Sequence, residues 1–199
     1  LASPLVAYCE PNHLRRACAP LPGGPNDTYY QSGEQWWLEQ IRADRLVAEG
    51  LVPNGAAVVI AVLDTGIHLA HPDLAGRLVA GTDVVNPGGD GDDDDVVFGG
   101  HGTHVAGIAA AATANGEGVA GTAATAPVRL MPVKVLDQNG EGYDFDIAQG
   151  LFWAQARGAR VFNLSLGGPN LGEALGDAVR EVHRRGGVVI ASTGNYAVV

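Results

Sequence analysis

This sequence is poor in positive charge, and it has no long apolar run. Its 199 residues contain 12 Lys and Arg against 22 Asp and Glu, which gives a formal net charge of −10. A protein that binds nucleic acid needs a basic face toward the phosphates, so this balance argues against a nucleic-acid partner. No apolar run approaches the roughly 20 residues of a membrane helix, so we expect no membrane partner either.

Cysteine is almost as scarce, with only Cys9 and Cys18, both in a proline-rich N-terminal segment. A disulfide between them is favoured and predicts an oxidising, extracellular setting; two free thiols in a cytosolic protein are the alternative. The chain opens at Leu1 without the regions of a signal peptide, which is typical of a processed or trimmed form. We therefore expect a secreted protein with an arm over residues 1–24 and one domain over 25–199.

Apolar runs typical of strands alternate along the chain with helical patterns. Strands are predicted over residues 56–63, 77–85, 128–136, 161–164 and 188–192, and helices over 36–48 (one or two short ones), 101–113, 143–155 and 171–185. This alternation predicts an α/β fold: a parallel central sheet with helices on both faces. In such sheets, ligands bind beyond the carboxyl ends of the strands.

Two residues at this expected edge suggest nucleophilic catalysis. Asp64 directly follows the first strand, and His101 lies between Gly100 and Gly102 at the start of a helix. Either residue alone is more often structural. Together, an aspartate that accepts from one imidazole nitrogen fixes the tautomer, and the other nitrogen can deprotonate a hydroxyl. The order Asp before His predicts a triad whose serine follows downstream.

Five segments carry a family resemblance. VVIAVLDTGIHLAHPDL, GGHGTHVAGIAA, FNLSLGG and VVIASTGN resemble, in order and spacing, the subtilisin-like serine proteases of the thermitase and subtilisin branch, and PNDTYYQSGEQWWLEQIRA is similar to the start of their mature domain. The similarity covers about residues 25–195. It implies a secreted serine endopeptidase with a subtilisin-like fold, of whose peptidase domain residues 25–199 would be the N-terminal and central part.

The resemblance also implies roles for single residues. Asp64 matches the triad aspartate, His101 the general base and Asn195 the oxyanion-hole donor, whereas His104 is the second histidine of the motif and not the base. A peptide or protein substrate would be clamped as an added strand between two backbone edges, formed by Gly140, Glu141 and Gly142 and by Ser165, Leu166, Gly167 and Gly168. A propeptide or protein inhibitor could use the same groove.

The family's Gly-Thr-Ser-Met-Ala nucleophile segment is absent from the sequence, and each serine that is present is better explained by a role other than nucleophile. Three accounts remain: a nicked enzyme with an associated C-terminal fragment that carries the serine, a truncated or partly recorded chain, or a half-protein with another role. A chain ending at Val199 would leave the apolar face of strand 188–192 exposed. The alternative to a protease is a catalytically incompetent peptide-binding fragment or pseudoprotease.

Calcium is the expected cofactor. Residues 90–95 hold five carboxylates, which form either a solvated acidic loop or a site for a hard cation. The resemblance points to calcium there, without fixing which carboxylates bind it, and Asp90, Asp92 and Asp94 are the candidate ligands. It also points to a second site built from Asp73 and Asn115. Asp27 could contribute to either site. The His-x-x-His spacings of this chain have neither a Glu-x-x-His pattern nor a cysteine ligand beside them, so zinc is not expected.

Overall fold

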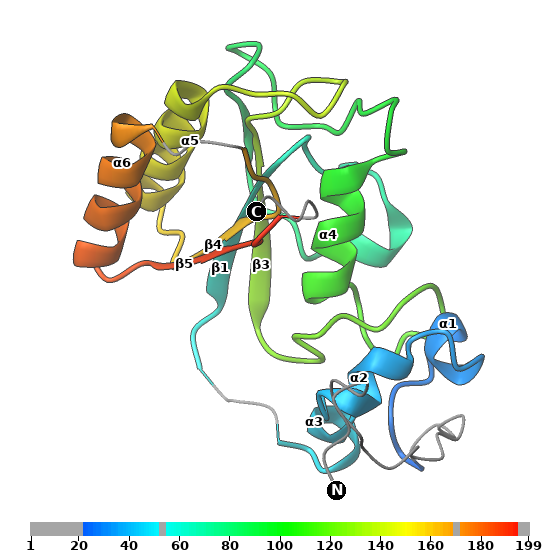
Figure 1. Cartoon of the computed structure of the whole chain (residues 1–199). Coiled ribbons are helices and arrows are strands. Elements are labelled where there is room, and N and C mark those ends of the chain that lie inside the picture. The colour runs from blue at the N-terminus through cyan, green and yellow to red at the C-terminus, as the bar shows by residue number, and fades with distance from the viewer. Residues whose placement is uncertain (1–21, 52–54, 169–171, 195–199) are drawn as a thin grey trace, which may run out of the picture.

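The computed structural model describes residues 22–51, 55–168 and 172–194. Figure 1 shows a central sheet with helices on both sides and three short helices apart from it. The short helices are α1 (Thr28–Gln31), α2 (Trp36–Gln40) and α3 (Asp44–Ala48). The remaining elements are β1 (Val58–Asp64), the 3₁₀ turn η1 (Pro72–Leu74), β2 (Thr82–Asp83), α4 (His101–Ala110), β3 (Val128–Lys134), α5 (Asp144–Ala156), β4 (Val161–Leu164), α6 (Glu173–Arg184) and β5 (Val188–Ala191).

All neighbouring strands of the sheet run parallel, in the order β2-β3-β1-β4-β5. The predicted fold class is confirmed. The chain leaves β1 for β2, returns to pair β3 with β1, and then adds β4 and β5 on the other side of β1. The carboxyl end of β1 is therefore next to the point where the direction of winding changes, and such points form crevices in open α/β sheets. Asp64 is the last residue of β1.

The strand predicted over residues 77–85 is much shorter than expected. Only Thr82–Asp83 forms a strand, with one isolated bridge from Leu78 to Leu130. The facing strand β3 carries Pro132, which has no N–H to donate. The carbonyl oxygen of Pro132 lies next to Gly81. The ladder between β2 and β3 is therefore interrupted opposite this proline.

Most predicted helices and strands lie within a few residues of their expected bounds. The helix predicted over 101–113 ends at Ala110, because Ala111 has an extended ψ of 156°. β1 is buried toward its carboxyl end, whereas its first residue, Val58, is 40% exposed. The longest helix in the described part of the chain, α5, has 13 residues. Within the described ranges, no helix is both long and apolar enough to cross a membrane.

The two faces of the sheet bury separate cores. On one face, α5 and α6 cover a cluster that includes Leu63, Val133, Leu151 and Phe162. On the other face, α4 packs over β1 and β3, with Val62 and Leu130 among the buried residues. Figure 1 shows α5 and α6 to the left of the sheet and α4 to its right. Alternate residues of β1 therefore serve opposite cores, as expected for a central strand.

The short N-terminal helices are attached to the loop after α4. Gln35 donates through Nε2 to the carbonyl of Ala120 at 3.0 Å and accepts the Ala120 N–H through Oε1 at 2.8 Å. Tyr30 and Leu38 form a small core with Ala120. Cys9 and Cys18, and most of the predicted arm, lie outside the described residues.

Candidate active site

Asp64 and His101 form a direct pair at the carboxyl edge of the sheet. The Nδ1 atom of His101 lies 2.7 Å from Oδ1 of Asp64. The same carboxylate oxygen accepts the N–H of Thr65 at 2.8 Å, while Oδ2 is buried and has no hydrogen-bond partner among the described residues. Asp64 is 0% exposed. Its burial raises the pKa above the usual value, although the hydrogen bond from His101 acts in the opposite direction.

The backbone around His101 brings its ring to Asp64. His101 is the first residue of α4 and follows Gly100, whose φ of 90° is one that glycine adopts most readily. A Cβ on Gly102 would collide with the carbonyl oxygen of Gly66, so this close approach of helix and loop requires a glycine. The N–H of Gly102 donates to Oγ1 of Thr65 at 2.9 Å. These glycines therefore allow α4 to begin directly against the end of β1.

His101 opens onto a groove of about 1320 Å³. Residues 140–142 and residues 165–168, which are the two predicted substrate edges, both line this groove. Because Nδ1 faces Asp64, Nε2 is the ring nitrogen that can exchange a proton in this groove. No hydrogen bond in the described part of the chain joins a serine to His101, and the hydroxyl of Ser192 donates to the carbonyl of Leu166. The predicted oxyanion donor, Asn195, lies outside the described residues.

The comparisons with known proteins agree with this geometry. The model of the subtilase family of peptidases matches residues 55–198. This chain belongs to the subtilase family. The resemblance seen in the sequence motifs is therefore confirmed, and the parallel sheet is the fold of a subtilase.

Individual subtilases match most of this chain but only part of their own length. The thermophilic serine proteinase of Bacillus sp. (strain AK1) is 42% identical over 193 residues, which are 97% of this chain and 45% of that protein. Thermitase of Thermoactinomyces vulgaris is 43% identical over 173 residues, 86% of this chain and 58% of thermitase. A crystal structure of a cold-adapted subtilisin-like serine proteinase matches with a TM-score of 0.59 and 31% identity, covering 70% of this chain and 47% of that one. The chain thus spans about half the length of these subtilases.

Three of the predicted metal ligands converge on the loop after α4. Asp73 accepts the side-chain N–H of Asn115 at 3.0 Å and the N–H of Val119 at 2.8 Å. Asp27 accepts the N–H of Ala114 through Oδ2 at 2.9 Å, and its other oxygen, Oδ1, is buried without a hydrogen-bond partner among the described residues. The side-chain oxygen of Asn115 accepts the N–H of Glu117. The unpartnered buried oxygen of Asp27 is therefore the feature here that suits a hard cation, which prefers oxygen ligands.

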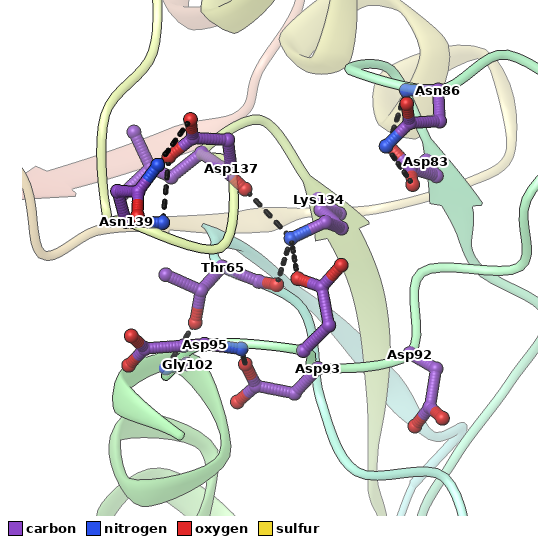
Figure 2. A network of polar contacts seen from close by, with 12 residues as sticks. Thr65, Asp83, Asn86, Asp92, Asp93, Asp95, Gly102, Lys134, Asp137 and Asn139 are labelled. Atoms are coloured by element: carbon purple, nitrogen blue, oxygen red, sulfur yellow. Dashed lines mark hydrogen bonds and ion pairs between the residues drawn. The ribbon is translucent and has the colours of Figure 1, made fainter. Parts of the chain in front are cut away.

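The acidic loop 90–95 is arranged differently. Asp94 pairs with Lys134, Asp92 accepts the N–H of Leu69, and Asp90 accepts the N–H of Asp92. Figure 2 shows the carboxylates of this loop pointing in different directions. Across the described ranges, no group of three or more His, Cys, Asp or Glu is placed to hold a metal ion. Calcium binding by Asp90, Asp92 and Asp94 therefore remains a prediction.

The sequence analysis missed the residues that anchor the start of α4. Asp95 accepts the N–H groups of Gly100 and His101 at 3.1 and 3.0 Å, and Asp93 accepts both the N–H and the hydroxyl of Thr103. Although partial burial opposes the effect, the backbone donors hold the pKa of Asp95 below its usual value. The signal in the sequence was an acidic run immediately before a helix, where carboxylates satisfy free N–H groups.

Lys134 is the other residue that the sequence analysis missed. It is 1% exposed and ends β3, a strand that is otherwise largely apolar. Its Nζ donates to the carbonyls of Thr65 and Leu136 at 2.8 and 2.9 Å and to Oδ1 of Asp94 at 2.5 Å. A lysine in an apolar strand was a visible signal, because a buried charge needs a partner.

Proposed function

We propose that this chain supplies the Asp-His part of the triad of a secreted serine endopeptidase. The observation that carries the proposal is the 2.7 Å contact between Nδ1 of His101 and Oδ1 of Asp64, with the imidazole open to a two-sided groove. A buried carboxylate against Nδ1 holds the proton on that nitrogen and stabilises the imidazolium that forms during catalysis. Membership of the subtilase family supports the same chemistry.

The proposed reaction is acyl transfer to a serine outside this chain. His101 takes the proton from the serine hydroxyl through Nε2 while the serine oxygen attacks the peptide carbonyl. His101 then gives this proton to the leaving amine. In the second half, His101 takes a proton from water as the water attacks the acyl carbon, and it returns this proton to the serine oxygen as the acyl–serine bond breaks. Asn195 would donate to the oxyanion of the tetrahedral intermediate.

The nucleophilic serine would come from a C-terminal fragment or from a continuation of the domain. Support comes from the edge strand β5, where Val188 and Ile190 are each 53% exposed. Contiguous apolar surface of this kind marks an interaction site. The substrate would be a peptide or protein held in extended form between residues 140–142 and 165–168, where main-chain hydrogen bonds tolerate varied sequences. A propeptide or protein inhibitor would fit the same groove.

We also propose structural calcium held by Asp27, Asp73 and Asn115. The support is the donor set itself, with one buried carboxylate oxygen of Asp27 left without a protein partner among the described residues. The bound ion would supply positive charge to the buried carboxylates of Asp27 and Asp73 and would fix the loop after α4, to which both are hydrogen-bonded.

The activity is tested by peptide hydrolysis with the purified protein, any companion polypeptide being retained. His101→Ala should lower kcat by about 10⁶-fold, because removing the general base abolishes nearly all of the rate enhancement that a triad provides. His68→Ala is a matched control, because His68 also faces an aspartate, Asp92 at 3.6 Å, but this pair is about half exposed. The control should keep kcat within about twofold. Peptide binding without hydrolysis in the wild type would favour the pseudoprotease instead.

A further inference from the structure

The strongest unexplained feature of the site is the buried ammonium of Lys134. A charged amine with 1% exposure loses its hydration, and the fold tolerates it only because protein acceptors replace the water. Lys134 has three such acceptors, one for each N–H: the carbonyl oxygens of Thr65 and Leu136 and the carboxylate of Asp94. The triad proposed above does not use this charge.

Each acceptor belongs to a different part of the active site. Thr65 directly follows Asp64, and its hydroxyl also receives the N–H of Gly102 in the first turn of α4. Leu136 precedes the turn that leads to the groove edge at residues 140–142. Figure 2 shows Lys134 between Thr65 and the acidic loop. One side chain therefore connects the strand that carries Asp64, the substrate edge and the loop in front of α4.

The third acceptor links Lys134 to His101. Asp94 lies between Asp93 and Asp95, and these neighbours hold the first turn of α4 through the N–H groups of Thr103 and His101. Movement of the loop would therefore move the backbone of His101. Asp64 and Lys134 are also direct partners in the register of β1 and β3, so the ammonium is anchored to the strand pair that carries the aspartate.

We propose that Lys134 is a positioning residue that fixes the separation of Asp64 and His101. Its ammonium group connects the end of β1, through the carbonyl of Thr65, to the loop that holds the start of α4. The same ammonium group is the positive charge that neutralises Asp94 in this structure. The inference rests on the proposed protease function. Because catalysis is sensitive to displacements of about 1 Å, loosening this link should reduce turnover more than substrate binding.

The test uses two variants and a control in the complete protein. Lys134→Met removes the ammonium, and Asp94→Asn weakens the same link through a side chain that is 56% exposed, so this second variant should fold even if the first does not. Asp177→Asn is the matched control: it disrupts an aspartate pair of equal length, 2.5 Å, that is exposed on α6. Active sites are counted by end-point labelling with a serine-directed phosphonate, and kcat is expressed per labelled site.

We expect kcat per labelled site to fall about 100-fold in Lys134→Met and about tenfold in Asp94→Asn, with KM changed less than about threefold. The low-field proton NMR signal of the His101 Nδ1–H should shift or broaden in both variants and stay unchanged in Asp177→Asn. A purely structural lysine would reduce the number of labelled sites but not kcat per site, and that result would overturn the proposal. A wild type that neither reacts with the phosphonate nor cleaves peptides would instead overturn the protease function.

Discussion

The two faces of the sheet are built in different ways. On the face covered by α5 and α6, the core is apolar and closed, and residues such as Leu151 and Phe162 are 0% exposed. On the other face, α4 packs over β1 and β3, and its first turn is held largely by carboxylates and Thr65. At the sheet edge, Val188 and Ile190 on β5 remain half exposed.

This difference suggests that the closed face mainly determines stability and that the polar contacts around α4 mainly determine catalytic geometry. The closed face buries enough apolar surface to hold the strands without help from polar contacts, whereas the polar contacts around α4 place individual atoms. Changes on the closed face should therefore lower stability and leave kcat per active site unchanged. Changes to the polar contacts at the first turn of α4 should lower kcat per active site more than they lower stability.

Asp64→Asn should change turnover and stability in opposite directions, and it has the largest expected effect of the changes that distinguish these two properties. This change should lower kcat by about 10⁴-fold, because an amide does not hold the correct imidazole tautomer. The variant should nevertheless be more stable than the wild type at pH 7, measured as the free energy of unfolding in urea, because the buried carboxylate is replaced by a neutral group.

The pH dependence of this gain follows from the raised pKa of Asp64. The folded protein binds this proton more tightly than the unfolded chain, so the resulting stability is present below the unfolded pKa and is lost as the pH rises through the folded pKa. The advantage of Asp64→Asn should therefore shrink as the pH falls from 7 toward 3. An advantage that grows on acidification would contradict the raised pKa.

The next effect belongs to the closed face. Leu151→Ala removes a side chain that is 0% exposed between α5 and the sheet, so the free energy of unfolding should fall by about 2–5 kcal/mol. Activity measured per phosphonate-labelled site at a temperature where the variant is folded should match the wild type. A large loss of kcat per site would show that the closed face also tunes the chemistry.

Calcium removal should have a smaller effect, on the α4 side. A ligand present at 100 times its Kd stabilises the folded state by about 2.7 kcal/mol, so a chelator should lower the Tm of the wild type measurably. Asp27→Asn should lower the Tm in calcium and abolish the response to chelator, whereas Asp177→Asn should keep that response. If Asp27→Asn and the wild type respond equally, calcium does not bind where we propose.

The smallest effect in the isolated chain is expected from Ile190→Ala. Because this side chain is 53% exposed, its removal should change the free energy of unfolding by less than about 1 kcal/mol. The same change should weaken binding of a companion polypeptide by about 1–3 kcal/mol, because an exposed apolar side chain contributes favourable free energy when a partner buries it. Equal effects with and without the companion would show that this surface is not the interface.

The sequence predicted the fold and the central pair well, for physical reasons. The apolar runs and their spacing are local signals, and they located the order of strands and helices. Asp64 and His101 could be paired because each ends or begins an element at the same edge of a parallel sheet, and the structure places them 2.7 Å apart. The residues of the two groove edges could be named only through the family motifs.

What the sequence could not predict depended on neighbours distant in the chain. The break in β2 arises from Pro132 on the adjacent strand, which pattern analysis of residues 77–85 cannot register. The acidic loop predicted calcium from its charge density, but the partner of Asp94 is Lys134, 40 residues later. A dense run of carboxylates indicates that a positive charge lies nearby. Only the folded structure shows whether that charge is a metal ion or a side chain such as Lys134.

The most direct test of the account is denaturing intact-mass analysis after reaction with a serine-directed phosphonate. We predict that the label lies outside residues 1–199, on a companion polypeptide or on a continuation of this chain, as located by peptide mapping, and that His101→Ala prevents this labelling. Label within residues 1–199, or labelling that is undiminished in His101→Ala, would contradict the claim that the Asp64–His101 pair activates a serine outside these residues.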